Sequence, residues 1–349
     1  MSNRLARLEA RRIDPMLKEA KLLNEVYRGI QQSESVRYAI GAMQPIDPEY
    51  TRNTFAQGDR VRDQLARRLT QSCDYRYQGS TTNDTHIRAR SDVDLLVILT
   101  AWYWLQPPQV ATYPYRGDEK QDMRDLRSES EGSLHNAFPA AEVDGDGGKA
   151  ICIDGGSLTR RIDVVPATWY NSNRFAETGD EVVRGVRVFD LENSTFITNY
   201  PFLHNACIDF KDTRTGGGLR KAARLMKSLK YDSESVTLSS YDIVSIAYNI
   251  PENQLAIAPP FELSIVDSCH DYCVQLSRDA ALRSKIHVPN GTRPVFGGRD
   301  GATEKQLDEL IAELSQLRHD ILTENARSFV KLAEARVEHG IRPQPVFVS

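Results

Sequence analysis

Residues 77 to 99 read YQGSTTNDTHIRARSDVDLLVIL, and this stretch decides the fold. It begins with the turn Gly79-Ser80, continues through polar residues and ends in an apolar run that carries Asp92 and Asp94 at its start. A short run rich in Val and Ile predicts a β-strand over 92–99. Side chains two positions apart on a strand point to the same face, so the two carboxylates project together, about 6 to 7 Å apart. Two like charges held this close repel each other.

A divalent cation would remove the repulsion between Asp92 and Asp94, because hard oxygen ligands with room for water suit Mg²⁺. A third carboxylate, Asp163, lies in the apolar segment RRIDVVP. If the two strands are neighbours, three carboxylates converge, which is enough for a two-metal site that activates an attacking oxygen and steadies a leaving one. Taken alone, the aspartate pair has a plainer interpretation as loop caps or as salt-bridge partners of Arg88 and Arg90.

The whole chain has the composition of a globular protein. Its 349 residues, 40% of them hydrophobic, predict two domains or one large bilobal unit. The first residues, MSNRLARLEARR, lack the apolar stretch of a signal peptide, and no window reaches the roughly 18 apolar residues of a membrane helix, so we expect a cytoplasmic protein with no membrane partner. Five scattered cysteines predict reduced thiols. The net charge of −4 and the absence of a Lys/Arg run predict no long nucleic-acid platform.

Hydrophobic spacing divides the chain into a mixed α/β half, 1–199, and a helical half, 200–349. The first half contains a long predicted helix beginning near Pro15, a second over 49–69, a surface helix within 106–149, a hairpin running from AICID to LTRRIDVVPA, and a strand in EVVRGVRVFDL. Predicted helices of the second half span 216–230, 240–249, 262–285 and 303–339. The last of these begins with Thr303 and Gln306 as a capping box.

The order Gly-Ser, Asp-x-Asp and a lone strand Asp resembles the pattern of the polymerase-β-like nucleotidyltransferases. The resemblance implies an α+β fold: a mixed β-sheet core flanked by helices, a C-terminal helical domain, a bilobal shape and a long N-terminal helix that braces both lobes. It also implies that Gly79 and Ser80 present N–H groups and a hydroxyl to a nucleoside triphosphate. Asp92, Asp94 and Asp163 are then the catalytic residues and the ligands of two Mg²⁺ or Mn²⁺ ions.

The helical half extends this resemblance. In GGGLRKAARLMKSLKYD an apolar stripe leaves Arg220, Arg224 and Lys227 on another face, which in most proteins is merely solvated. The segment also resembles the helix after the catalytic core of cGAS, oligoadenylate synthases and bacterial CD-NTases, where a lysine in the position of Lys227 contacts the donor triphosphate. LSSYDIVSIAYNI resembles the next helix of that family, which implies that Ser240 binds phosphate and Tyr241 stacks on a base. A helix N-cap for Ser240 and core packing for Tyr241 are the alternatives.

The complete pattern resembles a bacterial CD-NTase, a cyclic-oligonucleotide synthase of anti-phage defence operons. This implies a Mg²⁺-dependent enzyme that joins NTPs, ATP and/or GTP, into a cyclic di- or trinucleotide with release of pyrophosphate, and it implies regulatory proteins of the operon as partners. Two alternatives stay open at this point: a transferase that adds nucleotides to RNA or another acceptor, and a scaffold that binds nucleotide without catalysis. Base preference, linkage, ring size and activating signal do not follow from the sequence.

Histidine and cysteine residues of the helical half form a second candidate metal site. They occur as His204-x-x-Cys207 and Cys269-His270-x-x-Cys273, which are zinc-ligand residue types. The two groups lie far apart along the chain and their spacing is irregular, so we expect buried thiols in helices instead of a zinc site.

Overall fold

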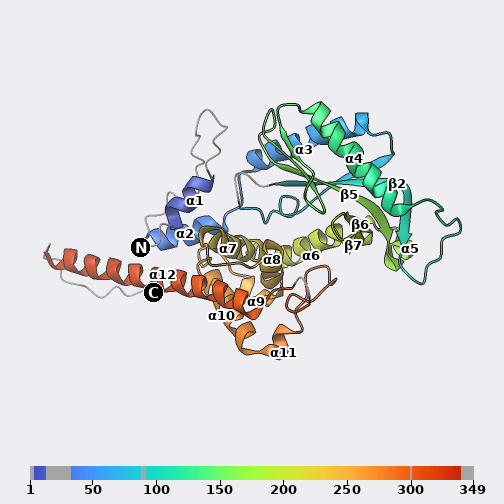
Figure 1. The fold of residues 1–349 in the computed structure, drawn as a ribbon. Helices are drawn as coiled ribbons and strands as arrows, with labels where there is room; N and C mark the ends of the chain where they lie inside the picture. Colours follow the sequence, from blue (N-terminus) through green and yellow to red (C-terminus); the bar gives the residue numbers. More distant parts are fainter. Residues whose placement is uncertain (1–3, 13–32, 88–91, 299–300, 339–349) are drawn as a thin grey trace.

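The structure is a computed structural model that describes residues 4–12, 33–87, 92–298 and 301–338, with the backbone alone for 12 and for 325–338. The long helix predicted to begin near Pro15 lies outside the described residues, as do Arg88 and Arg90. Figure 1 shows a β-sheet with helices above it and a layer of helices below it.

In the described residues, seven strands form one sheet in the order β1-β2-β5-β4-β3, with β6 pairing with β5 and then with β7. The strands are β1 (Cys73–Gln78), β2 (Val93–Leu105), β3 (Glu142–Asp144), β4 (Ile151–Asp154), β5 (Ile162–Asn171), β6 (Gly185–Asp190) and β7 (Thr195–Asn199). Strands β2 and β5 run parallel and the other pairs are antiparallel. The mixed sheet and the β4–β5 hairpin are as predicted, and the predicted strand over 92–99 extends to Leu105.

Helices make up the rest of the described fold. They are α1 (Arg4–Arg12), α2 (Glu34–Met43), α3 (Pro48–Arg68), α4 (Glu119–Ala137), α5 (Asn173–Thr178), α6 (Pro201–Arg214), α7 (Gly218–Asp232), α8 (Ser240–Asn249), α9 (Glu252–Leu255), α10 (Ser264–Arg278), α11 (Ala280–Arg283) and α12 (Glu304–Glu338), with a 3₁₀ turn at Glu181–Val183. The capping box is confirmed, since Thr303 and Gln306 exchange side-chain to backbone hydrogen bonds. None of the helices in the described part of the chain combines the length and hydrophobicity that a bilayer crossing requires.

Two predicted elements differ from the structure. The helix predicted over 262–285 is two helices, because Asp279 leaves the helical conformation and its side chain caps α11 by accepting the Leu282 N–H. The strand predicted in EVVRGVRVFDL begins only at Gly185, because Glu181–Val183 forms the 3₁₀ turn. Helix α6 was not predicted.

One face of the sheet packs against α3 and α4, which lie across it in Figure 1. Alternate residues of β2 point into this layer, and they meet Val61 and Leu65 of α3 and Met123, Leu126 and Leu134 of α4. The apolar stripe of α4 is therefore core rather than surface. The opposite face of β2 carries Asp94, Leu96 and Ile98, and beyond Asp94 it packs with β5, β6 and Phe202 of α6.

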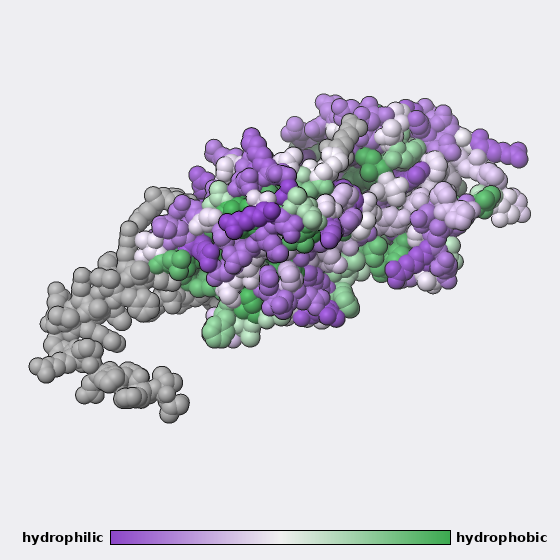
Figure 2. All heavy atoms as spheres, turned by 90° about the horizontal axis from the view of Figure 1, so that it is seen from below, coloured by the Kyte–Doolittle hydropathy of each residue, from purple (hydrophilic) through white to green (hydrophobic). Residues whose placement is uncertain are grey.

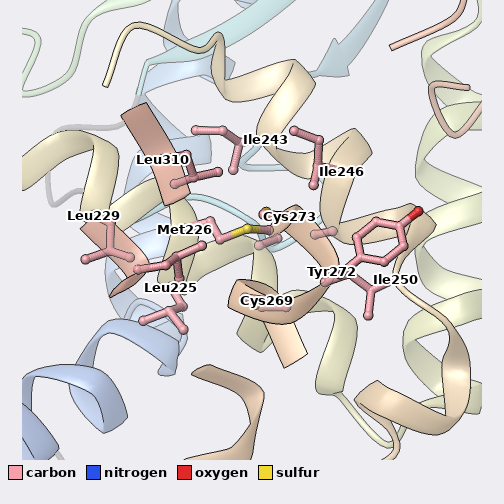
Figure 3. Packing of buried hydrophobic residues seen from close by; sticks show 14 of the residues in the cluster. Leu225, Met226, Leu229, Ile243, Ile246, Ile250, Cys269, Tyr272, Cys273 and Leu310 are labelled. Atoms are coloured by element: carbon pink, nitrogen blue, oxygen red, sulfur yellow. The ribbon is translucent and has the colours of Figure 1, made fainter. Parts of the chain in front are cut away.

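Helix α7 is at the centre of the second core (Figure 3). Its residues Leu225, Met226 and Leu229 pack against Ile243 and Ile246 of α8 and against residues of α10 and α12, and Cys269 and Cys273 of α10 are buried free thiols in the same cluster. Helices α1 and α2 also join this core. Seen from below, the surface is mostly hydrophilic with scattered hydrophobic patches (Figure 2).

Candidate active site

The two central carboxylates of the site are Asp94 and Asp163, which are register partners on the parallel strands β2 and β5. Neighbouring strands lie about 4.8 Å apart, so the two side chains start from adjacent backbone and share one face of the sheet. Asp92 is exposed one residue before β2 begins. The two aspartate-bearing strands are therefore neighbours, which is the condition on which the sequence predicts that the carboxylates come together.

Crowding of these carboxylates affects their electrostatics. Burial, and then the negative charges of Asp163 and Asp92, raise the pKa of Asp94 to about 7. Asp163 has a partial counter-charge, because Arg161 Nε donates a hydrogen bond of 3.2 Å to its Oδ1. A carboxylate whose ionised form is disfavoured by neighbouring anions gains from a nearby cation.

The donor set suits a divalent cation in its chemistry, although the side chains do not yet form a closed cluster. Among the residues that the structure describes, no three His, Cys, Asp or Glu side chains lie close enough to hold an ion as they stand. Asp163 is instead paired with Arg161. Mg²⁺ prefers hard carboxylate oxygens as ligands, and Asp94 and Asp163 offer them from neighbouring strands. The pKa of Asp94 is raised, so a cation would stabilise its ionised form, and the residues fit such an ion.

The Gly79-Ser80 turn lies directly beside Asp94. Gly79 follows β1 with φ of +84°, and a Cβ added to it would lie 2.0 Å from Asp94 Oδ2. Only glycine fits this position, both for its backbone conformation and for the space available. The turn is closed by backbone hydrogen bonds from Thr82 to Gly79 (3.2 Å) and from Thr85 to Ser80 (3.1 Å).

Three cationic side chains of α7 hold the residues that follow this turn. Arg220, Arg224 and Lys227 donate hydrogen bonds of 2.8, 2.7 and 2.7 Å to three consecutive carbonyl oxygens, those of residues 83, 84 and 85. The interpretation of this face as solvated is wrong, since Arg224 is only 4% and Lys227 only 5% exposed. The backbone carbonyls replace water as partners, and α7 thereby links the helical half to the Gly-Ser turn.

The pKa of Lys227 is strongly perturbed. Burial, with smaller effects of the Lys230 and Arg224 charges, lowers the pKa of Lys227 to about 7. The ammonium and neutral forms are therefore close in free energy near neutral pH, and an anion beside Lys227 would favour the ammonium.

A pocket of about 330 Å³ lies between the sheet and the helical half. This is within the range of about 300–1,000 Å³ that small-molecule sites occupy. Its lining residues are Gln78, Gly79, Ser80, Asn83, Thr85, Asp94, Asn199, Pro201, His204, Asn205, Lys227, Ser240, Tyr241 and Val244. All five predicted nucleotide-binding residues thus meet at one pocket together with Asp94, whereas Asp92 and Asp163 are not in its lining.

Comparison with known proteins places the chain in a family. Residues 206–318 match the cGAS/DncV-like nucleotidyltransferase C-terminal helical domain. The cyclic dinucleotide synthase CdnE of Yersinia aleksiciae is 35% identical over 318 residues, which cover 89% of this chain and 82% of that protein. The chain belongs to the cGAS/DncV-like nucleotidyltransferases, or CD-NTases. It is a nucleotidyltransferase of the cyclic-oligonucleotide synthases, and an RNA-tailing activity is not favoured by these relatives.

Solved structures share the fold of this CD-NTase. The STING-associated CdnE c-di-GMP synthase of Capnocytophaga granulosa has a TM-score of 0.75 at 24% identity, over 93% of this chain and 98% of that chain. The CdnE cyclic dinucleotide synthase of Elizabethkingia meningoseptica, solved with GTP and Apcpp, has a TM-score of 0.59 at 18% identity, over 81% and 97% of the two chains. The α+β class is confirmed, and nucleotides are the substrate class of the family.

Helix α8 of this CD-NTase brings Ser240 and Tyr241 to the pocket. The N-cap interpretation of Ser240 is wrong, because Ser239 is the N-cap and accepts the Asp242 N–H, while Ser240 is the exposed first residue of the helix. Tyr241 packs partly against the helical core, as the core interpretation expects, and it also lines the pocket, where stacking on a base stays a prediction.

Sequence reasoning missed the contribution of α6. Pro201, His204 and Asn205 line the pocket from the start of this helix, beside Asn199 at the end of β7. Of these residues only His204 is considered from the sequence, as a zinc ligand. Asn205 Nδ2 donates a hydrogen bond of 2.9 Å to Thr82 Oγ1 and so ties α6 to the turn. Pro201 is the available signal, because proline is favoured at the first position of a helix.

Proposed function

We propose that Asp92, Asp94 and Asp163 are the catalytic residues of this CD-NTase and that the adjoining pocket holds a nucleoside triphosphate. The observation that carries the proposal is the register pairing of Asp94 with Asp163, beside a pocket lined by Gly79 and Ser80. Carboxylates for a cation and a glycine turn for phosphate are the two parts that phosphoryl transfer needs.

The three aspartates would hold two Mg²⁺ or Mn²⁺ ions, with Asp163 a ligand of the catalytic ion only. Bound there, the ions would supply Lewis-acid polarisation of the phosphate and neutralise developing charge. The raised pKa of Asp94 supports this assignment. Burial and the neighbouring anions destabilise the ionised carboxylate, and a bound cation would stabilise it.

The triphosphate would be bound by groups from three elements. Gly79 and Ser80 offer backbone N–H groups and a hydroxyl after β1, and Ser240 offers its hydroxyl at the start of α8, where the helix dipole favours an anion. Lys227 has three N–H donors, of which its bond to Thr85 uses one, so the ammonium has donors left for phosphate oxygens.

The reaction joins two nucleotides by phosphoryl transfer. A sugar hydroxyl of one NTP attacks the α-phosphorus of the other, an O–P bond forms, the bond to the β-phosphate oxygen breaks, and pyrophosphate leaves. Asp163 assists by accepting the hydroxyl proton. The linear product then turns over, and a second attack of the same kind closes the ring. Positioning and electrostatic stabilisation carry the rate in this scheme.

We further propose that the substrates are ATP and/or GTP and that the product is a cyclic di- or trinucleotide second messenger. The enzyme would make it in the cytoplasm for anti-phage signalling, together with regulatory proteins of a defence operon. The name of the Yersinia aleksiciae relative, a cyclic dinucleotide synthase, supports the ring of two.

The test is to incubate the protein with the four NTPs and Mg²⁺, with and without an RNA oligonucleotide, and to measure pyrophosphate release and RNA length. We expect pyrophosphate release that does not depend on RNA. Release that requires RNA, with extension of its end, would contradict the proposal. Asp125→Asn is the matched control for substitution of a catalytic aspartate, because this exposed carboxylate lies on α4, which covers the opposite face of the sheet from Asp94.

A further inference from the structure

His204 has no assigned role in the scheme above, although it lines the pocket from the first turn of α6. The residue is only 8% exposed, and its Nδ1 is buried without a hydrogen-bond partner in the part of the chain that the structure describes. Native proteins rarely leave a buried side-chain nitrogen unpaired, so such an atom beside a ligand pocket calls for an explanation.

The ring of His204 has a fixed place in the pocket wall. It stacks on Tyr241 with ring centroids 5.0 Å apart and planes inclined by 20°. A stacked pair of aromatic rings at a pocket wall has a remaining π-face of the kind on which nucleobases stack. Tyr241 itself is held from the helical half, where the Arg293 guanidinium lies 5.3 Å from its ring.

The charge state of His204 indicates which part of a nucleotide it meets. Burial lowers the pKa of His204 to about 4, so the imidazole is neutral at physiological pH, with one N–H donor and one acceptor nitrogen. A neutral ring gives no charge attraction for phosphate but matches the donor and acceptor edge of a base. The wall that α6 contributes is uncharged throughout, consisting of Pro201, His204 and Asn205, whereas the cation Lys227 comes from α7.

We propose that His204 is a specificity-determining residue, which with Tyr241 forms the wall for the nucleobase of one bound NTP and hydrogen-bonds the polar edge of that base. The proposal rests on the proposed function in taking the pocket as an NTP site. It goes further by naming the residue that makes the pocket prefer one base over the others.

A purely supporting role for the ring is the competing explanation, and two substitutions separate the two roles. His204→Phe keeps the ring on Tyr241 and removes both nitrogens, so it changes base preference only if the nitrogens contact the base. His204→Asn keeps a donor and an acceptor but loses the stack. His135→Phe is the matched control, because His135 is exposed on α4 and is not in the pocket lining.

The experiment measures dissociation constants of non-hydrolysable analogues of the four NTPs, together with melting temperatures and product formation. For His204→Phe we expect the dissociation constant of the NTP analogue that the wild type prefers to increase about tenfold, as for loss of one good hydrogen bond. The dissociation constants of the other analogues should change less, and the melting temperature should not fall. An unchanged preference order and unchanged constants in His204→Phe would overturn the proposal.

Failure of the two proposals can be told apart. A wild type that binds NTP analogues selectively but makes no cyclic product would refute the proposed function, while a loss of selectivity in His204→Phe would still support the inference. A uniform loss of affinity for all four analogues in His204→Asn, with none in His204→Phe, would make His204 a support for Tyr241 and overturn the inference alone.

Discussion

A Cβ atom on Gly79 would lie 2.0 Å from Oδ2 of Asp94, well inside the sum of the atomic radii. The turn that follows β1 and the carboxylate on β2 are thus in direct contact across the strand pair in which Gln78 faces Asp94. Any side chain at position 79 must displace either the turn or the carboxylate. The proposed phosphate-binding and metal-binding groups therefore depend on each other geometrically.

Gly79→Ala should reduce product formation by about 100-fold, the loss expected when reacting groups are misplaced by about 1 Å. Gly155→Ala is the matched control, because Gly155 has a similar φ of +78° but open space around its Cβ position. The control introduces the same kind of backbone strain without the clash. Equal activity of the two variants in a product assay would contradict the importance of the Gly79–Asp94 contact.

Asp94→Asn and Asp163→Asn should each abolish cyclic product while raising the melting temperature of the metal-free protein. Removing one of several crowded anions relieves their repulsion, which burial makes stronger. Thermal unfolding in the presence of EDTA measures the stability, and mass spectrometry measures the product. Wild-type turnover in either variant would show that these carboxylates are not the catalytic ligands.

NTP affinity should fall as the pH rises above 7, because the pKa of Lys227 in the folded protein is about 7 and only the ammonium binds phosphate well. Between pH 7 and pH 8 the protonated fraction falls from about one half to about one tenth, so affinity should fall roughly fivefold. Lys227→Met should bind more weakly at pH 7 and show no such fall. The control is Lys221→Met, because Lys221 lies on the same helix as Lys227 and forms a partly exposed ion pair with Glu262. This variant should show the same fall of NTP affinity with pH as the wild type.

The same pKa determines how Lys227 affects stability. Its folded value lies below the ordinary value of 10.5, so between about pH 7 and pH 10 the unfolded chain binds more protons than the folded one. The contribution of Lys227 to the free energy of unfolding therefore becomes more favourable to the folded state as the pH rises through this range. A melting temperature difference between wild type and Lys227→Met that does not vary with pH would contradict the lowered pKa.

Arg224→Met should destabilise the protein and weaken NTP binding together. The guanidinium hydrogen-bonds the carbonyl of Met43 at 2.7 Å and the carbonyl of Asp84 at 2.7 Å, and leaving such buried groups unpaired costs about 1–3 kcal/mol each. Arg214→Met is the control, since that ion pair with Glu252 is largely exposed. A loss of stability with unchanged NTP affinity would show that Arg224 does not position the turn.

Local patterns were sufficient to predict four residues that the structure brings together at the candidate site. Gly79, Ser80, Asp94 and Asp163 lie on or beside two apolar strands, and each residue type has a chemical reason to occur there. That the two strands are neighbours was only a condition in the sequence analysis, and their parallel pairing comes from the structure.

Long-range contacts account for what the sequence did not reveal. The partners of Lys227 and Arg224 are carbonyls of Thr85 and Asp84, more than a hundred residues earlier, so an amphipathic pattern on α7 could not show that its polar face is buried. His204 presents no periodic signal either. The role proposed for His204 depends on its contact with the ring of Tyr241, and the fold brings these two residues of α6 and α8 together.

The most direct test of the account is mass spectrometry of the products that the purified protein makes from NTPs and Mg²⁺, after treatment with phosphatase. Phosphatase removes the terminal phosphates of NTPs and linear oligonucleotides but cannot degrade a ring without ends. The account predicts a phosphatase-resistant cyclic nucleotide in the wild type and none in Asp94→Asn. Only phosphatase-sensitive linear products, or the same cyclic product from Asp94→Asn, would contradict it.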